Sequence, residues 1–416
     1  MPAAKPMAGM EIRALTGLRG IAAVLVVIYH FAPWHSLSIR PVANVIGKGY
    51  LCVDLFFILS GFLLSLNYAH HFADGWSLRR WGDFLLRRLA RIYPLYFVLS
   101  ATALLTSLAL YYHGHGGSLP GGALLPATLG LAHPAGEIVA NGLLIQSWGI
   151  THSIDGPAWS ISTEWAAYLL FPLMAAAALF SSRGSALAVA AGAALLVGGT
   201  VFLTMTDGAY HSGPLDAYDG GSFEPILRCL GGFTLGMVTY RVAQSRRILA
   251  LASADGTLFS VLALLLLAAA AGLHDLVLYP LFALLVLGLY GNCGRVGRGF
   301  GIAPIYWLGL TSYAIYLLHL DLLAPRTALI DWLQAAWPAP WPRIAADAIC
   351  YIVLLIGADL AYRWIEVPGR RWLRRLGRPA DRGRQCATEE LRRIDSRAAG
   401  TRTKSPPSWP ADRMSA

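Results

Sequence analysis

Long apolar stretches alternate with short polar connections along most of the chain. A membrane-spanning helix needs about 20 consecutive, mostly apolar residues. Residues 184–206 and 300–320 contain no Asp, Glu, Lys or Arg. The pattern predicts an all-α, polytopic membrane protein with about ten transmembrane helices, at approximately residues 20–36, 49–68, 93–112, 157–180, 184–205, 225–243, 257–274, 276–292, 303–324 and 344–363.

The composition agrees with a membrane protein. Of the 416 residues, 56% are apolar and only 13% are charged, whereas soluble domains carry about 25% charged residues. This excludes a water-soluble chain and, for most of its length, intrinsic disorder. The five cysteines lie far apart, so a disulfide-stapled secreted module is excluded as well. We expect no metal site and no permanently bound cofactor.

The distribution of Lys and Arg predicts the orientation of the helices. With a cytoplasmic N-terminus and ten crossings, both termini lie in the cytoplasm. Cytoplasmic segments of membrane proteins are enriched in Lys and Arg. The predicted inner segments hold 28 of these residues, and the predicted outer segments hold five, namely Arg40, Lys48, Arg228, Arg326 and Arg343. Because a missed crossing would invert this bias downstream, the charges support the count of ten.

The C-terminal end differs from the rest of the chain. The formal charge is +10, and residues 363–416 contribute 14 Lys and Arg against 6 Asp and Glu, which is +8. A basic cluster beside a last membrane helix suits anionic lipid headgroups, so no nucleic acid is expected as a partner. We predict a transmembrane domain over residues 1–378 and a basic, disordered cytoplasmic tail over residues 379–416.

Ionisable side chains inside the predicted helices are candidates for function, because each is costly in the hydrocarbon region unless paired or hydrated. The depth of each residue within its predicted span places five of them in the outer half of the membrane. These five are His30, Asp54, Glu164, His319 and Asp321.

Arg19 and His30 are predicted to line one passage. They are eleven positions apart, which returns to within about 20° of the same helix face after about 16 Å of rise. A histidine can gain and lose a proton near neutrality, so His30 is a candidate general base. The alternative is a histidine that is only hydrogen-bonded between helices.

A cationic group formed by Arg87, Arg88 and Arg91 precedes the predicted span at 93–112. Guanidinium groups three or four residues apart on a helix point together and can hold a diphosphate by paired hydrogen bonds. A phosphate-rich donor made in the cytosol would dock there. Alternatively, these arginines only follow the positive-inside bias. We predict that residues 76–92 form an interfacial helix.

Several blocks of sequence resemble the acyltransferase-3 family of integral membrane O-acyltransferases. The resemblance covers most of residues 11–376. In chain order the blocks are IRALTGLRGIAAVLVVIYHF with Arg19 and His30, VDLFFILSGFLLS with Asp54, RRLARIYPLYF with Arg88 and Arg91, AWSISTEWAAYLLFP with Trp159, Ser160, Ser162 and Glu164, SYAIYLLH ending at His319, and YRWIEVPGRRW with Glu366 and Pro368.

The resemblance implies transfer of an acyl group, often acetyl, from cytosolic acyl-CoA to a hydroxyl of a carbohydrate, glycolipid or other acceptor. The transfer would take place at the outer side of a bacterial inner membrane. His30 would act as the base, and Glu164 or Asp54 would orient its ring. Direct transfer and a two-step route through an acyl-histidine are both open.

The same residues suggest binding sites for the two substrates. Acyl-CoA is expected to be held by Arg19, Arg88 and Arg91. The acceptor pocket is expected to comprise Trp159, Ser160, Ser162, Tyr316 and His319, although His319 could also make only an interhelical hydrogen bond.

Two other classes of function were compared with this one. Ten helices with buried carboxylates and histidines also describe a proton-coupled secondary transporter. Such a carrier would favour inverted repeats and broken helices, which the sequence does not show. A non-catalytic scaffold is disfavoured because His30 and Glu164 are present.

Overall fold

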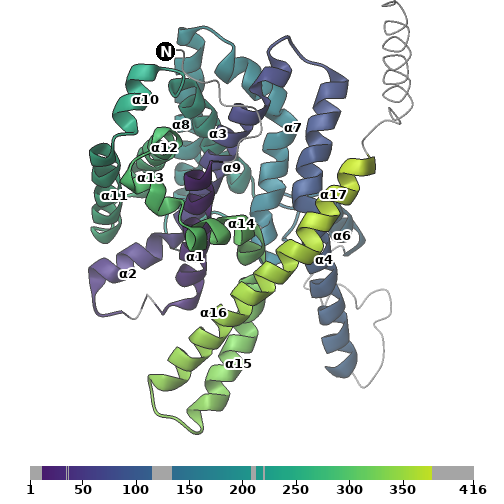
Figure 1. Ribbon diagram of the computed structural model, residues 1–416. Helices are drawn as coiled ribbons and strands as arrows, with labels where there is room; N and C mark the ends of the chain where they lie inside the picture. Colours follow the sequence, from purple (N-terminus) through teal and green to yellow (C-terminus); the bar gives the residue numbers. More distant parts are fainter. Residues whose placement is uncertain are drawn as a thin grey trace, which may run out of the picture.

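All regular structure in the described part of the chain is helical, which confirms the predicted fold class (Figure 1). The computed structural model describes residues 12–33, 35, 37–114, 134–207, 212–218 and 221–376. The predicted cytoplasmic tail, residues 379–416, lies outside these residues.

The helices follow one another with short connections. The α-helices are α1 (Arg13–Phe31), α2 (Arg40–Gly47), α3 (Cys52–Phe72), α4 (Leu78–Gly114), α6 (Pro134–Gly142), α7 (Trp159–Leu179), α8 (Arg183–Asp207), α9 (Glu224–Val242), α10 (Arg246–Ala252), α11 (Asp255–Ala270), α12 (Asp275–Gly291), α13 (Arg295–Phe300), α14 (Ala303–Leu318), α15 (Leu323–Gln334), α16 (Trp341–Ala361) and α17 (Val367–Leu376). A π-helical turn, Tyr362–Glu366, joins α16 to α17.

The number of membrane crossings is only partly established by the helices. Each of the ten predicted spans falls on a helix, but six of the described helices are long and apolar enough to cross a membrane. The number rises to eight if α10–α11 and α14–α15 are each counted as one bent span. The protein is therefore a multi-pass membrane protein, and ten crossings with two cytoplasmic termini remain a prediction.

The predicted interfacial helix is not a separate element. Residues 78–114 form one continuous 37-residue helix, α4, with Pro94 inside it. Pro94 lies at the start of the predicted span 93–112. Its missing N–H removes only one helical hydrogen bond, and the helix continues on both sides. The first half of α4 also packs on the bundle, because the Trp81 indole donates a hydrogen bond to the Leu169 carbonyl of α7.

Helix α1 lies in the centre of the bundle and packs extensively against α14, while α3 packs against α9 (Figure 1). Glycines make both contacts close. A Cβ atom at Gly309 of α14 would overlap the backbone oxygen of Thr16, and one at Gly236 of α9 would overlap that of Ile58. Small residues allow such backbone approach between membrane helices. The α1–α14 pair carries the residues on which the candidate site depends.

The α3–α9 contact can be tested with a matched pair of glycines. Gly236→Ala should destabilise the protein by about 1–3 kcal/mol, because overpacking forces the helices apart. Gly199→Ala in α8, where a Cβ would meet nothing within 4 Å, should be neutral or slightly stabilising. Thermal unfolding of both variants in detergent would measure the difference, and equal melting temperatures would contradict the packing described here.

Candidate active site

Three cavities lie in series between the helices. The arginine cavity, about 310 Å³, is lined by five arginines. The central cavity, about 160 Å³, shares Arg19, Arg88 and Arg91 with it. The histidine cavity, about 380 Å³, shares Val53 and Tyr316 with the central cavity. Because neighbouring cavities share wall residues, they form one line from a cationic end to an imidazole end.

Helix α1 spans this line, as its sequence predicts. Arg19 lines the arginine and central cavities, and His30 lines the histidine cavity. The helical rise between the two residues is about 16 Å. Both residues lie on one continuous helix, Arg13–Phe31, so the fold fixes the separation between the two ends.

His30 has a second histidine as its partner. The Nδ1 atom of His30 lies 2.9 Å from the Val26 carbonyl oxygen and 3.2 Å from Nε2 of His319. The Nδ1 atom of His319 lies 2.6 Å from the Tyr316 carbonyl oxygen. His319 is buried, 1% exposed, at the end of α14.

These contacts assign the protons of both rings. A carbonyl oxygen only accepts hydrogen bonds, so each Nδ1 atom carries a proton. Nε2 of a neutral His319 then accepts from Nδ1–H of His30. This leaves Nε2 of His30 as the basic nitrogen, on a ring that lines the histidine cavity.

Asp54 is not the group that orients His30. It is fully buried and forms a paired ion contact with Arg228, at 2.9 and 2.6 Å, and it also accepts a hydrogen bond from Tyr279. Arg228 in turn lines the histidine cavity and lies over the Trp159 ring, 5.3 Å from its centroid. The Asp54 carboxylate therefore positions Arg228, and Asp54 affects the cavity only through Arg228.

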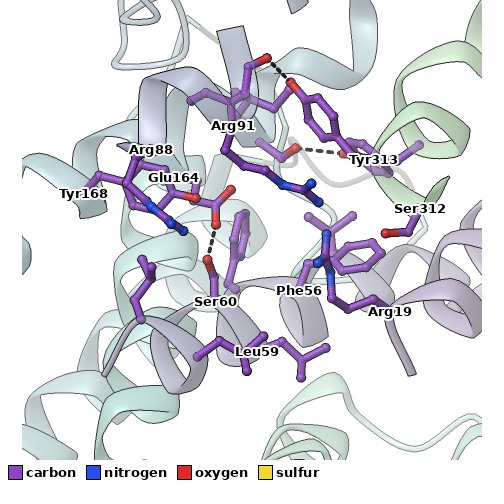
Figure 2. Close-up of a pocket in the computed structure, with 18 residues that line it drawn as sticks. Arg19, Phe56, Leu59, Ser60, Arg88, Arg91, Glu164, Tyr168, Ser312 and Tyr313 are labelled. Carbon is purple, nitrogen blue, oxygen red and sulfur yellow. Dashed lines mark hydrogen bonds between the residues drawn. The ribbon is translucent and has the colours of Figure 1, made fainter. Parts of the chain in front are cut away.

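Glu164 also lies away from His30. It accepts a hydrogen bond from Ser60 and lines the central cavity together with Arg19, Arg88 and Arg91 (Figure 2). The predicted grouping of His30, Asp54 and Glu164 at one depth is thus wrong in its details, because Glu164 accompanies the arginines. The three predicted arginines do converge: Figure 2 shows Arg19 from α1 and Arg91 from α4 extending toward one another.

The residues predicted for the acceptor pocket do not all lie in one cavity. Trp159, Tyr316 and His319 line the histidine cavity, and Ser160 lines the central cavity. The Ser160 hydroxyl lies 3.0 Å from the Tyr316 hydroxyl. Ser162 faces elsewhere: it donates to the Leu144 carbonyl and accepts from the Ser147 amide, at 3.0 and 3.1 Å. Its role is to hold the turn before α7.

The structure adds residues that the sequence-based prediction missed. Arg228 and Asp216 line the histidine cavity, and Arg370 and Arg374 line the arginine cavity. Arg228 could have been found, since an arginine inside the predicted span 225–243 needs a buried carboxylate. No sequence signal marked Asp216, which lies in a connection between helices and accepts hydrogen bonds from Tyr29 and the Ser212 amide.

The structural role of Asp54 can be separated from a catalytic one. Asp54→Asn should cost about 3–5 kcal/mol of stability, because it leaves Arg228 as a buried, uncompensated charge. Adding Arg228→Met should restore much of that stability, because the pair is then replaced as a unit. Chemical unfolding in detergent would measure both effects. A fully stable Asp54→Asn variant would contradict the pairing.

Cavities with cations at one end and an imidazole at the other, inside a multi-pass helical bundle, define a membrane enzyme that joins two substrates. A family model for an acyltransferase domain matches residues 12–363. Since this match covers most of the chain, the protein belongs to the acyltransferase-3 family of integral membrane acyltransferases. The prediction of an acyltransferase is therefore confirmed, and the transporter alternative loses its support.

Curated relatives agree with this assignment. The chain is 28% identical to acyltransferase MdmB of Streptomyces mycarofaciens over 416 residues, covering 92% of this chain and 98% of the relative. It is 23% identical to peptidoglycan O-acetyltransferase OatA of Listeria monocytogenes over 383 residues, which cover 86% of this chain and 56% of the relative. This chain thus spans only about half of the latter. No solved structure was found to match.

Proposed function

We propose that this acyltransferase moves an acyl group, typically acetyl, from cytosolic acyl-CoA to a hydroxyl of a carbohydrate or glycolipid at the outer side of a bacterial inner membrane. The observation that carries this proposal is the line of three cavities, which runs from five arginines to His30. The phosphates of the donor fit the cationic end. Its pantetheine arm then follows α1 toward His30, which brings the thioester to the wall formed by Tyr316.

The reaction balances with residues of this chain alone. Nε2 of His30 accepts the proton of the acceptor hydroxyl while the oxygen attacks the thioester carbon. The C–S bond then breaks, and the imidazolium returns the proton to the leaving thiolate of CoA. Tyr316 lines both the central and the histidine cavities and accepts a hydrogen bond from the Ser160 hydroxyl, so its own hydroxyl hydrogen can be donated to the oxyanion.

His319 and Asp216 support the base in different ways. His319 accepts from Nδ1–H of His30 together with the Val26 carbonyl, and both contacts favour the tautomer with an unprotonated Nε2. Asp216 supplies a negative charge in the same cavity, which stabilises the imidazolium as it forms. These two groups take the roles that were predicted for Glu164 and Asp54.

Removal of the base should abolish the chemistry and leave the protein intact. We expect His30→Ala to lower acyl transfer by about 10²–10⁴-fold with unchanged affinity for CoA, measured as free thiol released from acetyl-CoA in the presence of a glycan acceptor. His70→Ala, which changes an exposed histidine at the end of α3, is the matched control. An active, well-expressed His30→Ala variant would refute the base assignment.

The positioning role of His319 predicts a graded response. His319→Ala should lower kcat by about 10–100-fold, as is typical when a residue that positions a functional histidine is removed. KM for acetyl-CoA should stay unchanged. His319→Gln offers an amide oxygen to Nδ1–H of His30 and should recover part of kcat. If both variants lose the same activity and also lose thermal stability, His319 is only a packing residue.

A further inference from the structure

The arginine cavity extends beyond the three arginines that it shares with the central cavity. Its two further arginines, Arg370 and Arg374, come from α17 and line only this cavity. They therefore lie at the end of the line farthest from His30. A ligand that fills the whole line would place its most distant group against them.

Some guanidinium donors of the arginine cavity have no partner inside the described part of the protein. Nε and Nη2 of Arg370 and Nε of Arg88 are buried and have no hydrogen-bond partner within the described structure. Buried guanidinium donors without partners are costly. An anion with several oxygens would satisfy them.

The nearby carboxylate of Glu366 does not fill that role. It lies 3.7 Å from Arg91 and 3.6 Å from Arg370, which is too long for a hydrogen bond. It thus holds the two guanidinium groups near one another by charge and leaves their N–H groups available. The described residues that line the central and arginine cavities include five arginines. The carboxylates among these residues, or within ion-pair distance of their arginines, are those of Glu164 and Glu366. The site therefore has a net positive charge.

The position of α17 is fixed by local structure. The π-helical turn Tyr362–Glu366 precedes it, and such turns often occur at functional sites. Gly369 packs against Pro94 of α4, where an added Cβ would lie 2.5 Å from the proline Cβ. Arg370 is therefore held beside Arg88 and Arg91, which lie one to two turns before Pro94 on the same helix.

We propose that Arg370 and Arg374 bind the ribose 3′-phosphate of the acyl-CoA donor, while Arg19, Arg88 and Arg91 hold its diphosphate. This inference rests on the proposed function. The order follows from the cavities and from the structure of CoA: the diphosphate adjoins the pantetheine arm in the central cavity, and the 3′-phosphate lies on the ribose, on the other side of the diphosphate. The site would distinguish a 3′-phosphorylated donor from its dephosphorylated form.

The test compares acetyl-CoA with acetyl-dephospho-CoA, which lacks only the 3′-phosphate. Wild type should show at least about a tenfold higher KM for the dephospho donor, as expected for loss of a charge-assisted contact. The double variant Arg370→Ala with Arg374→Ala should show a similarly raised KM for acetyl-CoA and no further rise with the dephospho donor. Arg371→Ala with Arg375→Ala removes the same charge from exposed positions of α17 and should behave as wild type.

Calorimetric binding of CoA and dephospho-CoA to the full-length protein in nanodiscs gives the same comparison without turnover. The binding measurement therefore tests this site even if no acyl transfer is observed with any donor. A lack of acyl transfer would count against the proposed function and not against the phosphate site. Discrimination retained in the Arg370/Arg374 double variant, or absent in wild type, overturns the inference. A third result would also overturn it: both compounds bind equally, and phosphatidylglycerol competes with them in wild type but not in the double variant. That result would assign the arginines to a lipid headgroup.

Discussion

The cost of placing charge inside a low-dielectric helix bundle governs both the stability and the chemistry of this protein. Two charged groups buried outside the central and arginine cavities are paired directly: Arg228 with Asp54, and Lys48 with Asp275. The arginine cavity departs from this arrangement, because cations outnumber carboxylates there. Such a surplus of positive charge is tolerated where water or an anionic ligand supplies the missing partner.

Close helix packing turns this electrostatic arrangement into a fixed geometry. Gly20 of α1 and Gly309 of α14 allow the two backbones to touch. One helix carries His30, and the other ends at His319, so the contact between the two imidazoles is set by a rigid helix pair. Sites built on packed helices hold their geometry more closely than sites built on loops, which suits a base whose tautomer depends on the positions of Val26 and His319.

Local periodicity was sufficient to predict the helices and the shared face of Arg19 and His30, because both follow from the rise and turn of one helix. The partners of the buried groups depend on contacts between distant segments. Asp54 meets Arg228, 174 positions away, and a carboxylate in a predicted span gives no indication of which cation will reach it. The arginines of α17 were visible only as part of a basic C-terminal end. Their approach to Arg88 and Arg91 depends on the packing of Gly369 on Pro94, which no periodicity encodes.

The wall between the central and histidine cavities explains how a reactive thioester could be used without being wasted. Tyr316 and Val53 line both cavities, so under the proposed function a donor from one end and an acceptor from the other would meet there. The central cavity is the smallest of the three described here, and its apolar wall includes Phe56 and Leu63. Under the proposed function, a pantetheine arm in this cavity would displace water, and exclusion of water protects activated acyl groups from hydrolysis. Under the same proposal, the acceptor hydroxyl would have the advantage over water because the acceptor would be held beside His30.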